Sequence, residues 1–254
     1  MREDLQALLT RARVDASPTA ASARLVSLDE LAAQRSGSGQ STSRDGKAAD
    51  AAEPSAAERL SYPALRGRLI ELSGAGATAA LSAAVQLVWE AQVAAEPVAW
   101  IALRGSSFYP PDVVEGGVDL SALAVIRVPD VTSAGRAAER LLRSNAFGLV
   151  ILDLAGPDCV IERNVVHRTR DKALSIANQG RLVTLAQQAD CLVVCITSKK
   201  RGWESMGSLI SLRADASRER DEQGFCVSLR VLKDKRRGPG WGRRERAKGP
   251  AGLT

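Results

Sequence analysis

Apolar residues in the middle of the chain form short continuous runs, and longer amphipathic stretches separate these runs. A short unbroken run is typical of a strand buried on both faces, whereas apolar residues three or four positions apart are typical of a helix. The expected strands are RLIELSG (68–74), VAWIAL (98–103), LAVIRVP (123–129), GLVILDL (148–154) and CLVVCIT (191–197). The expected helices lie at 77–95, 133–145 and about 172–188. Their alternation predicts an α/β fold with a mostly parallel sheet flanked by helices.

The pattern changes after Ser198. Residues 209–235 contain two segments in which apolar and polar residues alternate, and the polar turn DEQG (221–224) separates them. Such alternation is typical of strands with one buried face. The segment therefore predicts a C-terminal antiparallel hairpin at the edge of the sheet.

The two ends of the chain differ from this core. Residues 1–35 carry two weak helical patterns; the first places Leu5, Leu8 and Leu9 on one stripe, and the second begins near Leu25. Residues 36–59 are rich in Gly, Ser and Ala, which predicts a flexible linker. The core is expected to span residues 60–234, and the basic tail 235–254 is expected to be disordered because it has no core-forming pattern.

The composition narrows the class of protein. With 254 residues, 45% of them hydrophobic, the chain is long enough to bury one sizeable core. No apolar run approaches the roughly 20 residues that cross a bilayer, and the N-terminus lacks a signal-peptide core, so we expect a cytoplasmic protein without membrane contact. Four cysteines form no CxxC pair, which favours buried thiols over metal ligands or a disulfide. These are Cys159, Cys191, Cys195 and Cys226.

The positive charge is concentrated at the C-terminal end. Residues 199–254 hold 15 Lys and Arg against 7 Asp and Glu, whereas residues 1–198 hold 20 against 22. This asymmetry indicates an acidic partner such as nucleic acid, or a solvated tail without a dedicated ligand. The residues expected to bind DNA are Lys199, Lys200, Arg201 and Trp203 in one loop, and Lys233, Lys235, Arg236, Arg237, Trp241, Arg243, Arg244 and Arg246 near the tail. They combine phosphate neutralisation with rings that could stack on bases, and a protein-docking tail is the alternative.

The turn after the first strand lies where a nucleotide-binding protein would hold a phosphate. Gly74 and Gly76 permit a tight turn, but a complete phosphate loop also needs a Lys and a hydroxyl residue. The positions for the last Gly, the Lys and the hydroxyl hold Ala79, Ala80 and Leu81, and a shift of two residues puts Thr78 at the Lys position. We therefore expect a degenerate phosphate loop (Gly74, Gly76 and Thr78), without a nucleotide cofactor or a metal.

Two other polar residues could carry chemistry. Asp153, at the end of LVILDL, lies where an acid would coordinate Mg²⁺ through water, although an Asp at a strand end is as often a cap. One acid without a phosphate-loop Lys cannot run phosphoryl transfer. The single histidine, His167, has no catalytic or metal-binding partner at a meaningful spacing, so we expect a surface residue.

The order of these segments resembles the ATPase core of RecA over roughly residues 64–239. LIELSG is similar to its first core strand and phosphate loop, FYPPDVVEGGVDLSALAVIRVPD (108–130) to the segment through a Tyr and a GVD, and LVILDL to the Walker B strand. LAQQADCLVVCIT and VSLRVLKDKRRGPG are similar to the following helix and strand and to the hairpin that ends the core. FYPP and the missing phosphate loop favour the shortened relatives of the ImuA type, also described as SulA-like or RecA-like.

The resemblance implies a function. ImuA-type proteins are non-catalytic accessory factors of the SOS DNA-damage response, which support error-prone translesion synthesis. Their expected partners are RecA, an ImuB-like homologue of Y-family polymerases, an error-prone replicative-type DNA polymerase and DNA, with self-association possible. In RecA an acid after the strand similar to VAWIAL orients water, but here no carboxylate follows until Asp112. RecA also implies that the Leu5, Leu8 and Leu9 stripe packs on a neighbouring copy, although it could equally cover its own domain.

Two alternative functions remain at this point. One is a diverged DNA-dependent ATPase or recombinase with an altered loop. The other is a SulA-like inhibitor of cell division, which only the label of shortened relatives suggests. A nucleoid-associated cytoplasmic location follows from the favoured function.

Overall fold

The computed structural model describes residues 55–76, 78–104, 106, 108–155, 173–221 and 224–247. The expected N-terminal stripe of Leu5, Leu8 and Leu9 and the predicted linker up to residue 54 lie outside these residues. Cys159, His167 and the end of the predicted basic tail also lie outside them. Within the described part of the chain, no helix is both long and apolar enough to cross a membrane.

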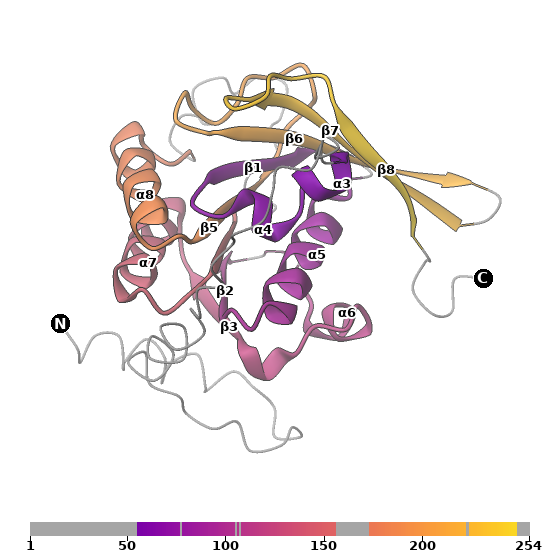
Figure 1. Cartoon of the computed structure of the whole chain (residues 1–254). Coiled ribbons are helices and arrows are strands. Elements are labelled where there is room, and N and C mark those ends of the chain that lie inside the picture. Colours follow the sequence, from indigo (N-terminus) through magenta and orange to yellow (C-terminus); the bar gives the residue numbers. More distant parts are fainter. Residues whose placement is uncertain are drawn as a thin grey trace, which may run out of the picture.

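One eight-stranded sheet organises the molecule, in the order β3-β2-β4-β5-β1-β6-β7-β8 (Figure 1). Neighbouring strands from β3 to β6 pair in parallel, whereas β6, β7 and β8 pair antiparallel. The bounds are β1 Leu69–Gly74, β2 Val98–Leu103, β3 Leu123–Val128, β4 Leu149–Asp153, β5 Leu192–Ser198, β6 Leu212–Asp221, β7 Gly224–Asp234 and β8 Gly242–Ala247. The expected α/β fold with a mostly parallel sheet and a C-terminal antiparallel hairpin is confirmed.

Helices cover both faces of the parallel strands. They are α3 Ala56–Arg59, α4 Tyr62–Leu65, α5 Ala80–Val93, α6 Pro110–Glu115, α7 Val131–Ser144 and α8 Ile176–Gln188, with the short 3₁₀ helix η1 Leu120–Ala122 before β3. Figure 1 shows α7 and α8 on one side of the sheet and α5 on the other. Two hydrophobic clusters result, one between α5 and the sheet and one under α7 and α8. The central strands β1, β2 and β4 are buried at every position because helices cover them from both sides.

Local signals set the ends of the helices. The Asp130 side chain accepts a hydrogen bond from the Ser133 amide (2.7 Å) and caps the start of α7. The same helix ends at Asn145, which adopts the left-handed conformation (φ 54°) that Asn tolerates. At Ser55 a capping box with Glu58 starts α3, so helical structure begins four residues before the expected core boundary at residue 60.

The expectation of a disordered tail from residue 235 is wrong for residues 242–247, which form β8 and pair with β7. The turn between them is closed by hydrogen bonds that join Val231 and Trp241, and Gly240 and Val231. Gly238 and Gly240 supply the positive φ values (77° and 100°) that this turn requires. Trp241 packs against the α5 cluster, with the Arg59 guanidinium 6.0 Å from its ring centre. Backbone pairing with β7 therefore orders a segment that has no hydrophobic pattern of its own.

Candidate nucleic-acid interface

The turn after β1 uses its own amides. The Thr78 N–H donates to Gly76 O (2.8 Å), the Ala79 N–H to Ala216 O (3.2 Å) and the Ala80 N–H to Thr78 Oγ1 (3.1 Å). A phosphate loop needs such successive N–H groups free to surround the phosphate. A Cβ at Gly74 would also collide with the Thr78 side chain and Ala216 O. The turn therefore joins β1 and α5 to β6, and three of its successive donors are already occupied.

Asp153 lies buried at the end of β4. Ser106 Oγ donates a hydrogen bond to Asp153 Oδ2 (2.6 Å), and the Ala155 N–H donates to Oδ1 (3.3 Å). Burial raises the pKa of the Asp153 carboxyl, although the hydrogen bond from Ser106 opposes this shift. Among the described residues, no group of three or more His, Cys, Asp or Glu could hold a metal ion. Asp153 therefore links β4 to the segment after β2, and it caps its own strand end.

A buried acid that the sequence reasoning missed lies on β1. Glu71 is fully buried, and its carboxylate accepts hydrogen bonds from Thr197 Oγ1 (2.8 Å) and the Met206 N–H (2.7 Å). Lys199 Nζ lies 3.1 Å from Glu71 Oε1. A buried carboxylate requires such partners because desolvation of an unpaired charge is costly. Lys199 was expected to contact a DNA phosphate, but its partner is a carboxylate inside the protein. The glutamate within the otherwise apolar strand LIELSG was the sequence feature that could have indicated this ion pair.

The cysteine prediction is confirmed for three of the four positions. Cys191, Cys195 and Cys226 are buried thiols. Burial raises the pKa of the Cys195 thiol well above its usual range, and the nearby Glu71 carboxylate adds to the shift. This thiol therefore stays protonated, as expected of a core residue.

The loop after β5, residues 199–211, lies across the sheet face that carries Glu71. The buried Arg213 guanidinium donates hydrogen bonds to Lys200 O (3.1 Å) and Trp203 O, and to Ser73 Oγ (3.0 Å). Lys233 Nζ donates to the carbonyl oxygens of Gly207 and Ser208, and burial lowers its pKa. Charged side chains of the sheet thus hold the loop backbone. Lys233, like Lys199, is directed at the protein.

The tip of this loop remains open to solvent. Lys200 is exposed, and 40% of Trp203 is exposed. The Arg201 side chain is 51% exposed while its Nε lies 3.0 Å from Asp215 Oδ2 on β6. A cation and an aromatic ring are therefore presented together on a fixed backbone.

Strand register brings the tail arginines to the same face of the sheet. Asp215 of β6 pairs with Arg230 of β7, and one step further Ser217, Ser228 and Arg244 lie across from one another. A further step aligns Glu219, Cys226 and Arg246. Because alternate residues of a strand share a face, Arg230, Arg244 and Arg246 lie on the side that carries Asp215 and Arg201. Arg230 was not predicted, although its place between Leu229 and Val231 marked an outward position.

This side of β6 to β8 is not the one that packs on α5. Ala216, Leu229 and Val231 project from the opposite face into the α5 cluster. In the described part of the chain, the cluster under α7 and α8 includes no residue of β7 or β8. We call the open surface the basic face. Its residues are Lys200, Arg201, Trp203, Arg230, Arg244 and Arg246.

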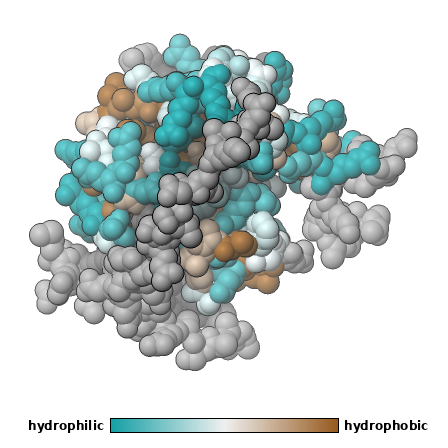
Figure 2. All heavy atoms as spheres, viewed as in Figure 1, coloured by the Kyte–Doolittle hydropathy of each residue, from teal (hydrophilic) through white to brown (hydrophobic). Residues whose placement is uncertain are grey.

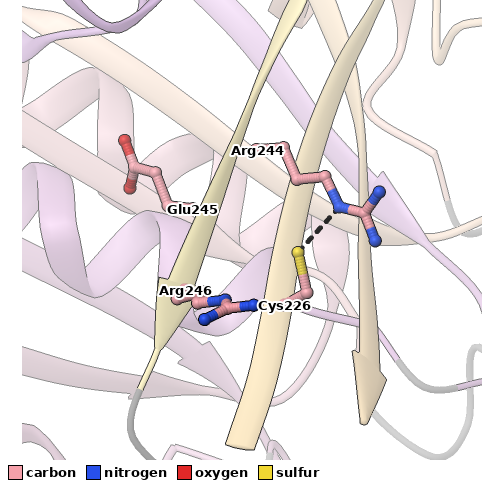
Figure 3. Close-up of a pocket in the computed structure, with 4 residues that line it drawn as sticks. All are labelled: Cys226, Arg244, Glu245 and Arg246. Carbon is pink, nitrogen blue, oxygen red and sulfur yellow. Dashed lines mark hydrogen bonds between the residues drawn. The ribbon is translucent and has the colours of Figure 1, made fainter. Parts of the chain in front are cut away.

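Figure 3 shows the β8 end of the basic face. Arg244 Nε lies 2.8 Å from Cys226 Sγ, and Arg244 Nη2 forms an ion pair with Glu219 (3.3 Å). Arg246 lies beside Cys226, whereas Glu245 points away from both. These contacts restrain Arg244 while leaving its side chain 66% exposed.

Other residues of the predicted DNA site lie elsewhere. Arg243 alternates to the opposite face, where its side chain is only 12% exposed and lies 3.4 Å from Glu245. The turn from β7 to β8 carries the exposed Lys235, Arg236 and Arg237. It lies at the end of the sheet where strand β1 starts, away from the basic face. Trp241 is partly buried against the core and donates to Gly238 O (3.0 Å). The structure therefore places one part of the predicted DNA site on the basic face and the other predicted residues outside it.

Comparison with known proteins adds no family to this picture. No protein-family model and no curated protein match the sequence. The basic face and the occupied turn after β1 are thus the observations that bear on function.

Proposed function

We propose that the protein is a non-catalytic, RecA-like accessory factor of the ImuA type. It supports error-prone translesion synthesis in the SOS response by binding DNA, RecA and an ImuB-like polymerase homologue, and it reaches an error-prone replicative-type polymerase directly or through them. It acts in the cytoplasm at the nucleoid. The observation that carries the proposal is the basic face, where two basic runs distant in sequence lie on one open side of the sheet.

DNA is the ligand that this surface fits best. Its four arginines and Lys200 outnumber the acids Asp215 and Glu219 on the same side and the exposed Glu204 of the loop, so it attracts a polyanion. Arginine pairs with phosphate oxygens through a planar fork of donors. The half-exposed Trp203 offers a ring on which an unpaired base can stack, worth about 1–3 kcal/mol per base. Cations combined with a stacking ring favour a single strand over a duplex, whose bases are already stacked.

A scaffold role agrees with the turn after β1. Three successive amides there are bound within the protein, and the chain has no Lys in this turn to neutralise a triphosphate. Asp153 is engaged by Ser106 and the Ala155 amide. These contacts support the non-catalytic assignment. The partners RecA and ImuB-like protein come from the family resemblance, and capture of purified partners by the tagged full chain tests them directly.

The DNA proposal is tested with a double variant, Arg244→Ala with Arg246→Ala. Binding of a fluorescent oligothymidylate is measured by anisotropy over a salt series. Each lost phosphate contact lowers the slope of log Kobs against log salt by about 0.7, so we expect a loss of about 1.4. The matched control is Arg236→Ala with Arg237→Ala, which removes the same charge outside the basic face and is expected to lower the slope less.

Two results would overturn the proposal. An equal loss in both double variants would show that DNA senses net charge and not this face. ATP turnover that depends on single-stranded DNA and disappears in Asp153→Ala would identify an ATPase instead.

A further inference from the structure

An exposed apolar patch lies on the side of the molecule formed by α5, α6 and η1. Its residues are Trp89, Val93, Val114 and Leu120, which are 40%, 69%, 50% and 38% exposed. Figure 2 shows hydrophobic residues gathered at the surface where Figure 1 places α6. Large apolar side chains grouped in this way mark a surface that another segment covers.

The segments that carry the patch are tied together. The Gln92 side chain donates to Asp119 O (2.8 Å) and accepts from the Asp119 N–H (2.9 Å), which fixes η1 against α5. A Cβ at Gly117 would lie 3.6 Å from the Trp89 ring, so the backbone before η1 passes close to that ring. The patch is therefore a preformed surface, not a set of separate side chains.

The surroundings of the patch are acidic. Neither α5 nor α6 contains a Lys or Arg, and residues 105–126 contain none either. Asp112 and Asp119 are exposed within the segment that carries Val114 and Leu120. The surface thus suits an apolar stripe that carries positive charge.

We infer that the N-terminal segment 1–14 of the same chain docks on this patch. Its pattern places Leu5, Leu8 and Leu9 on one stripe, and Arg11 and Arg13 follow directly. As a helix, the segment would set three leucines against the patch. Arg2, Arg11 and Arg13 outnumber Glu3 and Asp4, so the segment carries a small positive excess that suits the acidic surroundings. Helix propensity alone does not stabilise so short a segment, so an apolar contact provides the stabilisation that it needs.

The described chain begins at Ser55 with α3, beside β8, and α4 then brings it to α5. The Tyr62 N–H donates to the Glu90 carboxylate (2.6 Å), one residue after Trp89 on α5. As a flexible coil, the 40 residues 15–54 would have an r.m.s. span of about 35 Å, which is longer than α5 and lets segment 1–14 reach the patch from Ser55. Such a tether gives an effective concentration of about 1 mM, so even a weak contact is occupied.

The test uses the full-length protein and two double variants. Leu5→Asp with Leu8→Asp breaks the first stripe, and Leu25→Asp with Leu28→Asp makes the same change in the second helical pattern as a control. Hydroxyl-radical footprinting reports exposure of Trp89, and hydrogen exchange reports protection of residues 5–12. We expect Trp89 oxidation to rise and protection to fall by about tenfold in the first variant alone, as for a tethered contact with a Kd of about 0.1 mM.

A variant of the patch provides the reciprocal measurement. Val93 is 69% exposed, so Val93→Asp should fold normally and release residues 5–12 to the same extent. Protection that is unaffected by Val93→Asp, or that the control variant removes equally, would overturn the inference. Protection that increases with protein concentration would also overturn it, because the segment would then dock on a second copy.

Discussion

Two regions of the same sheet differ in how their polar side chains are engaged. At the carboxyl ends of β1, β2 and β4, amides, hydroxyls and a carboxylate form hydrogen bonds with one another, as Thr78 and Ser106 show. On the basic face beyond β6, charged side chains make one or two guanidinium contacts and still remain more than half exposed, as Arg201 and Arg244 show. The ends of parallel strands are the usual place for a ligand in an α/β fold. Here, polar groups at that place stabilise the sheet, and the proposed ligand surface lies on the antiparallel extension.

The two regions are also linked. Glu71 and Arg213 are buried in the sheet, and both hold the backbone of the loop that presents Trp203. Buried polar groups of the central sheet therefore support the open face. Variants in the buried sheet, in the turn after β1 and on the basic face can separate the contributions of these regions to stability and to DNA binding.

The largest effect is expected from Glu71→Ala, which affects the buried sheet and the loop of the basic face above it. It removes the acceptor for Thr197 and Met206 and leaves Lys199 without its buried partner, which costs about 3–5 kcal/mol of unfolding free energy. Urea unfolding measures the loss, and DNA affinity should fall with it as the loop loosens. Glu245→Gln, at a side chain that is 53% exposed, should stay within about 0.5 kcal/mol of the wild type. A loss in Glu71→Ala as small as in this control would contradict the role of Glu71.

The next effect concerns the turn alone. Gly74→Ala places a methyl group against Thr78 and Ala216 O and should cost about 1–3 kcal/mol. At Gly202 an added Cβ meets nothing within 4 Å, so Gly202→Ala serves as the control. DNA binding by the folded Gly74→Ala protein should be unchanged. Loss of binding without unfolding would place the turn in the interface.

A smaller effect is expected from the basic face alone. Trp203→Ala should weaken binding of single-stranded DNA by about 1–3 kcal/mol through lost stacking, with little change in melting temperature. Trp203→Phe keeps an aromatic face and should retain most of the affinity. Equal affinities for the Phe and Ala variants would rule out stacking as the role of this ring.

The smallest effect is a pH dependence at Asp153. Because burial raises its pKa in the folded state, the native protein binds more protons than the unfolded chain just above the unfolded pKa of about 4. Its contribution to stability is therefore lost as the pH rises through this range toward the folded pKa. Asp153→Asn removes the titration, so its stability relative to the wild type should rise between pH 4 and 7 in urea unfolding. A constant difference across that range would show that Asp153 is not perturbed.

The sequence predicted the fold well because the parallel strands are buried on both faces and therefore appear as unbroken apolar runs. Strands β2 and β3 begin at the predicted residues, Val98 and Leu123. The residues GRRERA of β8 have no such run, because this strand is ordered through hydrogen bonds to a partner whose pairing the local pattern does not reveal. The local pattern of apolar residues indicates which strands are buried, but it does not indicate which strands pair.

The candidate site was predicted only in part for a related reason. Composition identified the basic residues, but the direction of each side chain depends on strand parity and on distant acids. Arg243 and Arg244 are neighbours in sequence, yet they lie on opposite faces. Lys199 and Lys200 are neighbours too, and only the first reaches Glu71. Knowledge of the register with β7 and of the buried acid on β1 would have separated them.

Strand β8 has a further consequence as the outermost strand of the described sheet. An edge strand exposes unpaired backbone groups, and a second copy can add to them in a growing stack. The charges of Arg243, Arg244, Glu245 and Arg246 oppose this, because a parallel, in-register copy would bring identical charges together. Arg244 and Arg246 of this strand also belong to the basic face, so we expect neutral substitutions along β8 to reduce solubility as well as the proposed affinity for DNA.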